Sequence, residues 1–232
     1  MLTAAKVLTD HISLLTLGVL AAIFTASVWV FGQLVRRETS HRRRAILSEW
    51  ARTRDLRLAD PANAPDASVF MTPLAAFNPR IDFLIHGRQI AIVQVRTDNS
   101  PSASGTGSVA PHWKLLLRRL DEDWPITALR PTAHTSSLID LFSMSSFPSL
   151  GATQRFVIFG VNAAAARSLS ASTAPALLPP DIGLLLHGQL LILDFTPRPF
   201  DQIEFGRMID LAEQLAPRLI PPRPGAAQAG SA

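Results

Sequence analysis

Residues 81–96 read IDFLIHGRQIAIVQVR, which is two runs of aliphatic, β-branched and aromatic residues around Gly87. Runs of this kind on both sides of a glycine are typical of a β-hairpin. Residues 181–195 read DIGLLLHGQLLILDF and repeat the pattern around Gly188. An internal duplication would explain the similarity, but so would two unrelated hairpins, because aliphatic runs around a turn glycine are common. Either way, the sequence predicts two similar β-hairpins.

Further strands are predicted between the two hairpins. Residues 113–120 have the composition of a strand, residues 121–123 (Asp-Glu-Asp) are expected to turn the chain, and residues 126–130 to return it. Residues 155–161 are another strand candidate. Because strands outnumber helices and pair with their neighbours in sequence, we expect an α+β domain built on antiparallel sheet.

A C-terminal amphipathic helix is predicted from about residue 201 to residue 216. Its apolar residues fall on one stripe at helical spacing. Asp201 followed three residues later by Glu204 resembles a capping box, and Pro217 stops the helix.

An apolar segment precedes the domain. Residues 12–35 contain no charged residue, and about 20 such residues span a bilayer as a helix. A buried core helix is rarely so long and uncharged. A cleaved signal peptide would have a basic start, a shorter apolar core and a small-x-small site. We therefore predict a transmembrane helix that holds the chain in the membrane.

Arginines follow this segment closely, whereas only Lys6 and the amino terminus precede it. Lysine and arginine are retained on the cytoplasmic side of a membrane. We therefore expect a single-pass protein of the inner membrane, with its N-terminus outside and its C-terminal domain in the cytoplasm. The basic patch that determines this orientation or contacts lipid headgroups consists of Arg36, Arg37, Arg42, Arg43, Arg44, Arg52 and Arg54.

The basic patch also accounts for the charge of the whole chain. From residue 36 to residue 55 there are seven arginines and three acidic residues, a balance equal to the chain's net charge of +4. We predict a helix over residues 36–56, with Ile46, Leu47 and Trp50 on one face, which packs on the domain or lies along the bilayer. A nucleic-acid-binding or partner-binding helix is the alternative. Because topology already explains the arginines, no nucleic acid is expected as a partner.

The sequence predicts five segments along the chain. They are a short N-terminal tail (1–11), the transmembrane helix (12–35), the basic juxtamembrane helix (36–56), the α+β domain (57–220) with a flexible loop (99–110), and a disordered tail (221–232).

No motif for known chemistry is present. The chain has no cysteine, which excludes disulfides, thiolate metal sites and cysteine nucleophiles, and it lacks HExxH, GxSxG, GxGxxG and P-loop motifs. His86 and His187 each precede a turn glycine and would hold a metal only if the two hairpins lay side by side; solvated turn histidines are the alternative. Trp113, Lys114 and the Arg118-Arg119 pair fit ordinary strand alternation. We predict no catalytic residue, no metal and no cofactor, and we identify no small-molecule ligand.

The layout resembles bacterial membrane-anchored proteins of unknown function in which a transmembrane segment precedes one α+β domain. The resemblance implies a fold and an anchor, and it implies no catalytic residues. The turn at Gly188 departs from the Gly-Asp turn that is frequent in such proteins. The resemblance covers about residues 45–220 and rests on LSEWA (47–51), LRL (56–58), the hairpin at 81–96, the strands at 113–130 with Trp124-Pro125, LRP (129–131), RFVI (155–158), ALLP (176–179) and the terminal hairpin and helix.

Three functional hypotheses follow. The leading one is a non-enzymatic, membrane-tethered cytoplasmic domain that binds a protein partner or supports an envelope assembly. The second is a membrane-anchored, hydrolase-like enzyme that uses His86, His187 or Asp194. The third is an anionic-lipid-binding module that works through residues 36–54.

Overall fold

The computed structural model divides into two compact units, residues 1–49 and residues 50–232. Each unit has its own internal contacts. The residues that the structure describes are 24–27, 29, 42, 44–64, 68–72, 74, 79–96, 112–133 and 147–219.

The first unit is helical wherever it is described, at residues 24–27, 29, 42 and 44–49. Within the described residues, no helix is both long enough and apolar enough to cross a membrane. Most of the apolar segment at 12–35 lies outside those residues, so the transmembrane helix and the orientation of the chain stay predictions.

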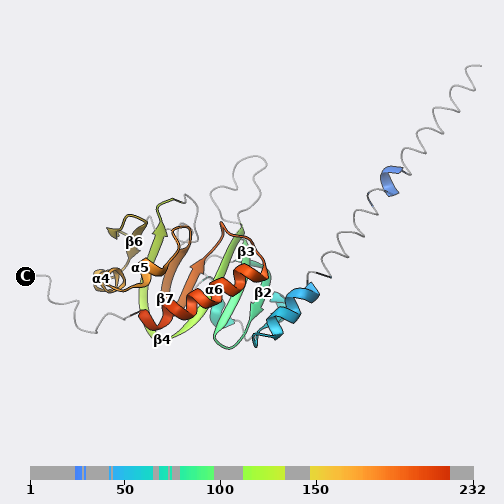
Figure 1. The fold of residues 1–232 in the computed structure, drawn as a ribbon, viewed down its shortest axis with the longest axis horizontal. Helices are drawn as coiled ribbons and strands as arrows, with labels where there is room; N and C mark the ends of the chain where they lie inside the picture. The colour runs from blue at the N-terminus through green and yellow to red at the C-terminus, as the bar shows by residue number, and fades with distance from the viewer. Residues whose placement is uncertain are drawn as a thin grey trace, which may run out of the picture. The chain divides into compact units, whose positions relative to one another are not determined.

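The second unit is an α+β domain built on antiparallel sheet, as the sequence predicts (Figure 1). Its described strands form one seven-stranded sheet. Its described elements are β1 (Arg57–Ala59), η1 (Pro61–Asn63), α2 (Ser68–Met71), β2 (Arg80–His86), β3 (Ile90–Arg96), β4 (His112–Pro131), β5 (Ser149–Ala152), β6 (Phe156–Gly160), α4 (Ala163–Ala171), α5 (Ala174–Leu177), β7 (Gly183–Asp194), α6 (Gln202–Leu215) and η6 (Ala216–Arg218).

The first predicted hairpin is confirmed as β2 and β3. Ile85 lies opposite Ile92, and the backbone N–H of Gly87 donates to the carbonyl of Ile90 at 2.8 Å. A Cβ at residue 87 would lie 2.7 Å from Cδ2 of Leu56 and 3.1 Å from the carbonyl oxygen of Asp55, so the glycine lets the turn approach that backbone closely. The loop predicted at 99–110, after β3, and the tail predicted at 221–232 lie outside the described residues.

The second predicted hairpin is wrong. Residues 183–194 form one continuous strand, β7, and do not reverse at Gly188. Gly188 has a φ of 55° and lies opposite Trp124 of β4, at a point where the register shifts. A left-handed glycine within a strand marks a bulge or corner as readily as a turn. The two similar sequences therefore adopt different structures, since β2–β3 is a hairpin and β7 is a single strand.

The two strand segments predicted at 113–120 and 126–130 are confirmed, but the turn predicted between them at 121–123 is wrong. Both segments belong to β4, which runs through the acidic residues at 121–123 without turning back. The register with β7 shifts on both sides of Trp124. β4 and β7 thus bend together, and the breaker residues mark a corner in two long paired strands.

The corner organises the whole sheet around β4. β7 pairs with both halves of β4 along one edge. Along the other edge, β3 pairs with residues 112–118 of β4 and β6 pairs with residues 127–131. The order of strands is β1-β2-β3-β4-β6-β5, with β7 beside β4.

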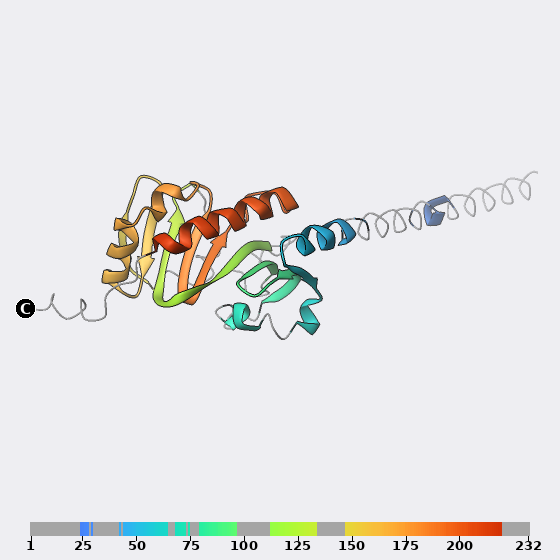
Figure 2. The same ribbon diagram turned by 60° about the horizontal axis from the view of Figure 1, so that its bottom comes forward.

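Each face of the sheet carries a hydrophobic core. Leu115 and Leu117 share one core with Phe70 of α2. Leu116 lies between them in sequence, so its side chain is on the opposite face, where it is also fully buried. α6 lies across that second face (Figures 1 and 2). Burial on both faces explains why the strands read as continuous apolar runs and not as alternating ones.

The C-terminal amphipathic helix is confirmed as α6. Its first turn is capped by Asp201, whose Oδ1 accepts from the backbone N–H groups of Ile203 at 3.1 Å and Glu204 at 2.9 Å. Glu204 does not complete a capping box, because its carboxylate binds Arg198. The buried residues of the predicted stripe are Phe205, Met208, Ile209, Ala212 and Leu215.

The juxtamembrane helix ends at residue 52, before the predicted end at residue 56. Residues 53–55 form a turn in which Asp55 has a φ of 55° and the N–H of Leu56 donates to the carbonyl of Ala51 at 2.9 Å. A left-handed residue with a hydrogen bond back into the last turn is a common helix ending. The chain then enters β1.

Replacing Gly188 by alanine is expected to lower the free energy of unfolding by about 1 kcal/mol. An added Cβ would meet no atom within 4 Å, so the loss comes from the left-handed backbone alone. Urea denaturation of the full chain in detergent, followed by tryptophan fluorescence, measures it. Asparagine tolerates this backbone better, so Gly188→Asn should lose less, and equal stability of all three proteins would contradict the explanation.

Candidate functional site

A groove opens where the corner of β4 meets the end of α6. Its volume is about 610 Å³. We call it the corner groove. The residues that line it are Gln89, Arg118, Arg119, Leu120, Asp121, Glu122, Trp124, Glu213, Ala216, Pro217 and Leu219.

Three separate elements build the corner groove. The β2–β3 turn supplies Gln89, whose carbonyl accepts from the N–H of Arg119 at 2.8 Å. The corner of β4 supplies the residues around Asp121. The third wall is the end of α6, where Pro217 stops the regular helix and η6 follows.

Arg118 is the most unusual residue of the corner groove. Its side chain is 24% exposed, and the one ion pair that it makes with another described residue is a 3.8 Å contact from Nη1 to Oε1 of Glu213. That distance is too long for a hydrogen bond. Its buried Nε has no hydrogen-bond partner among the described residues. This one nitrogen is thus withdrawn from water without the hydrogen bond that burial normally requires, while the side chain as a whole stays partly exposed.

The rim of the corner groove carries charges of both signs. Arg119, Asp121 and Glu122 are exposed. Within the described part of the chain, these three side chains make no hydrogen bond or ion pair. They are therefore available to a binding partner.

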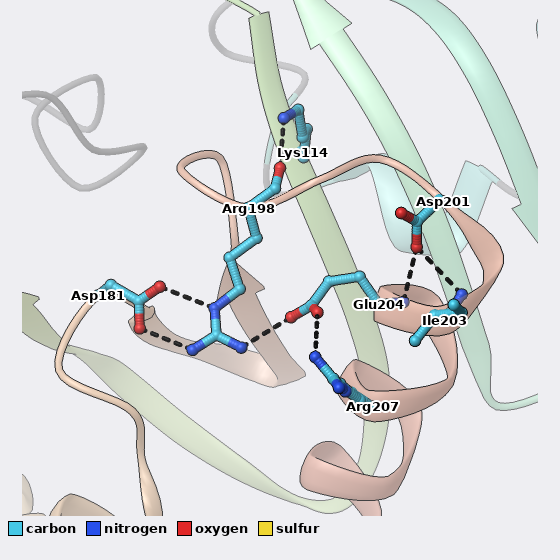
Figure 3. Close-up of polar contacts among 7 residues, drawn as sticks. All are labelled: Lys114, Asp181, Arg198, Asp201, Ile203, Glu204 and Arg207. Atoms are coloured by element: carbon cyan, nitrogen blue, oxygen red, sulfur yellow. Dashed lines mark hydrogen bonds and ion pairs between the residues drawn. The ribbon is translucent and has the colours of Figure 1, made fainter.

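A second charged cluster, centred on Arg198, serves the fold. Figure 3 shows its guanidinium between Asp181 and Glu204. Nε and Nη2 donate to the two oxygens of Asp181 at 2.7 and 2.8 Å, and Nη1 donates to Oε1 of Glu204 at 2.8 Å. Lys114 Nζ donates to the carbonyl of Arg198 at 2.5 Å. This cluster, the Arg198 clamp, joins β4, the turn before β7, the loop after β7 and α6.

The Arg198 clamp has no free capacity for a ligand. The hydrogen bond to Asp181 raises the pKa of Arg198 above its usual range, and the hydrogen bond to Glu204 acts in the same direction against the effect of burial. Arg207 approaches the other oxygen of Glu204 at 3.4 Å. The carboxylates are satisfied within the protein, which is the arrangement expected of a structural ion pair.

The predicted basic patch is described only in part. Arg42, Arg44, Arg52 and Arg54 are exposed, whereas Arg36, Arg37 and Arg43 lie outside the described residues. Arg54 has a contact that the sequence did not indicate. Its guanidinium carbon lies 5.3 Å from the ring centroid of Trp50, and its Nη2 would be 3.3 Å from a Cβ at Gly206. Arg54 therefore packs on the domain, and Gly206 of α6 leaves room for it.

The residues of the hydrolase and metal hypotheses are not brought together. His86 ends β2, whereas His187 lies in β7, and β3 and β4 separate these two strands. Asp194 is buried, and its Oδ1 accepts from the N–H and the hydroxyl of Thr196 at 3.0 and 2.5 Å. No group of three or more histidine, aspartate or glutamate residues suited to a metal ion occurs in the described part of the chain.

Comparison with known proteins adds one structure. No family model matches this chain, and no curated protein does. The crystal structure of the mycobacterial trehalose monomycolate transport factor A, TtfA, is similar over 79% of this chain and 97% of that chain, with 12% sequence identity and a TM-score of 0.49. A similarity at this level assigns no activity, partner or residue role to this chain.

Proposed function

We propose that this protein is a membrane-tethered, non-enzymatic domain that binds a protein partner on the cytoplasmic side through the corner groove. The observation that carries the proposal is the composition of that groove. About half of its lining residues are charged or polar, and the exposed charges at its rim have no partners in the described part of the protein. Pockets for small molecules are predominantly apolar, whereas protein interfaces combine an apolar centre with a polar rim.

The tether rests on the sequence. The uncharged segment at 12–35 is long enough to cross a bilayer. The arginines that follow it favour a cytoplasmic domain. A reporter that is active only outside the cytoplasm, fused after residue 232, is expected to be silent. Activity of that reporter would contradict the orientation.

The partner is expected to co-purify with the full chain after gentle detergent extraction and cross-linking. Glu122→Lys should reduce recovery of the same partner several-fold, because reversing a rim charge opposes a complementary surface. Asp210→Lys is the matched control, since Asp210 is an exposed carboxylate of α6 outside the corner groove. Repeated recovery of the protein alone, or equal recovery with both variants, would contradict the proposal.

A further inference from the structure

We propose that Arg118 is the recognition centre of the corner groove and binds an acidic side chain on an extended peptide segment of the protein partner. This inference rests on the proposed function and makes it more specific. No described residue of the chain forms a hydrogen bond with the Arg118 side chain.

Arg198 is an arginine of equal burial whose hydrogen-bond donors are paired within the fold, so it serves as a comparison for Arg118. The side chains of Arg118 and Arg198 are both 24% exposed. Arg198 donates three hydrogen bonds to two carboxylates. Among the described residues, Arg118 has only the 3.8 Å ionic contact with Glu213, which is itself 57% exposed. Such a weak surface ion pair contributes little to the stability of the fold. A ligand can therefore displace Glu213 from Arg118 with little loss of free energy.

The chemistry of the guanidinium favours a carboxylate. Its planar fork matches the two oxygens of a carboxylate in a bidentate pair. The groove lining carries two arginines and three acidic residues. A phosphate, which carries more negative charge, is repelled more strongly by Asp121, Glu122 and Glu213 than a carboxylate is.

The other residues of the corner groove indicate which residues of the peptide should neighbour its acidic side chain. Leu120 and Pro217 offer apolar surface in the same groove as Arg118. Asp121 and Glu122 stand at the rim, where they can pair with a basic residue. The complementary segment is therefore a peptide in which apolar residues flank one acidic residue and a basic residue follows.

Two capped peptides, acetyl-Leu-Glu-Leu-Lys-amide and its glutamine counterpart, test the assignment on the full chain in detergent micelles by ligand-observed NMR. The glutamate peptide is expected to bind about tenfold more tightly, because the bidentate charged pair is lost with glutamine. Arg118→Gln should abolish this preference, and Arg118→Lys should abolish most of it, since lysine keeps the charge without the fork. Arg167→Gln, at an exposed arginine of α4, should retain it.

Folding is checked separately. Because the Arg118 side chain makes no hydrogen bond among the described residues, Arg118→Gln should unfold within about 3 °C of the unchanged protein. Equal binding of the two peptides, or a preference that survives Arg118→Gln, would overturn the assignment. Tighter binding of glycerol 3-phosphate than of the glutamate peptide would overturn it in favour of a lipid headgroup.

The peptide test and the co-purification test can fail independently. If the partner is recovered and Glu122→Lys releases it, while the two peptides bind equally, the carboxylate assignment is wrong and the proposed function stands. If no partner is recovered, the proposed function is wrong whatever the peptides do.

Discussion

Alanine in place of Phe205 will lower the free energy of unfolding by about 3–5 kcal/mol. Phe205 is fully buried on α6. Its ring centroid lies 4.7 Å from that of Phe200 and 5.7 Å from that of Trp50. Removing the ring leaves a cavity between α6 and the sheet, because close-packed neighbours relax only in part. The edge contacts between the rings are lost as well.

Urea denaturation of the full chain in detergent, followed by tryptophan fluorescence, gives the loss as a shift in the midpoint at constant slope. Ile203→Ala is the matched control on the same helix. Ile203 is 69% exposed, so its truncation should change stability by less than about 0.5 kcal/mol. Similar losses in the two variants would show that α6 is not fastened to the sheet through Phe205.

Replacing Arg198 by methionine will lower the free energy of unfolding by about 3–5 kcal/mol, since it leaves buried charge without its partner. Glu204 is only 4% exposed, and water cannot replace the lost guanidinium there. The same denaturation experiment measures the loss. Arg207→Met removes a second cation near Glu204, but Arg207 is 67% exposed and lies 3.4 Å away, so less than about 1 kcal/mol is expected.

The contribution of Arg198 should not change with pH in the neutral and mildly alkaline range. Its hydrogen bonds to Asp181 and Glu204 raise the pKa of Arg198 above its unfolded value. A group with a raised pKa stabilises the fold fully below the unfolded pKa and loses that effect only above it. The difference between the unchanged protein and Arg198→Met should therefore be constant from about pH 6 to pH 9. A marked fall toward pH 9 would contradict the assignment.

Local signals predicted the elements whose partners are near in sequence. The β2–β3 hairpin closes over Gly87 and a few neighbouring residues, so its turn and its pairing are both visible in the same stretch. α6 was equally predictable from the sequence, because its cap at Asp201 and its apolar stripe lie within one short stretch of sequence.

The corner of β4 and β7 was not predictable in this way. A glycine such as Gly188 and an acidic run such as 121–123 interrupt strand patterning whether the chain turns back or merely bends. Which of the two occurs depends on pairing between residues 112–131 and residues 183–194. Burial on both faces also removes the alternation that would have shown one long strand.

The candidate site was hidden for a related reason. Arg118 follows three leucines and looks like the polar face of a strand. The place of Arg118 in the corner groove, with Glu213 as a distant ion-pair partner, depends on α6 and η6. The chain reaches these two elements only after β7. The basic patch was visible because it is a run in sequence, but the packing of Arg54 against Trp50 required the turn at Asp55.

The shared bend of β4 and β7 has a consequence during synthesis. β4 lies at the centre of the sheet, yet the strand that covers one of its edges is made only after residues 132–182 have been translated. At about 5–20 residues per second, that delay lasts several seconds. During that time the nascent chain presents an apolar strand edge on which other chains can pair. The sheet is therefore incomplete until β7 has been made, and a chain released before that point should be a substrate for chaperones and proteases.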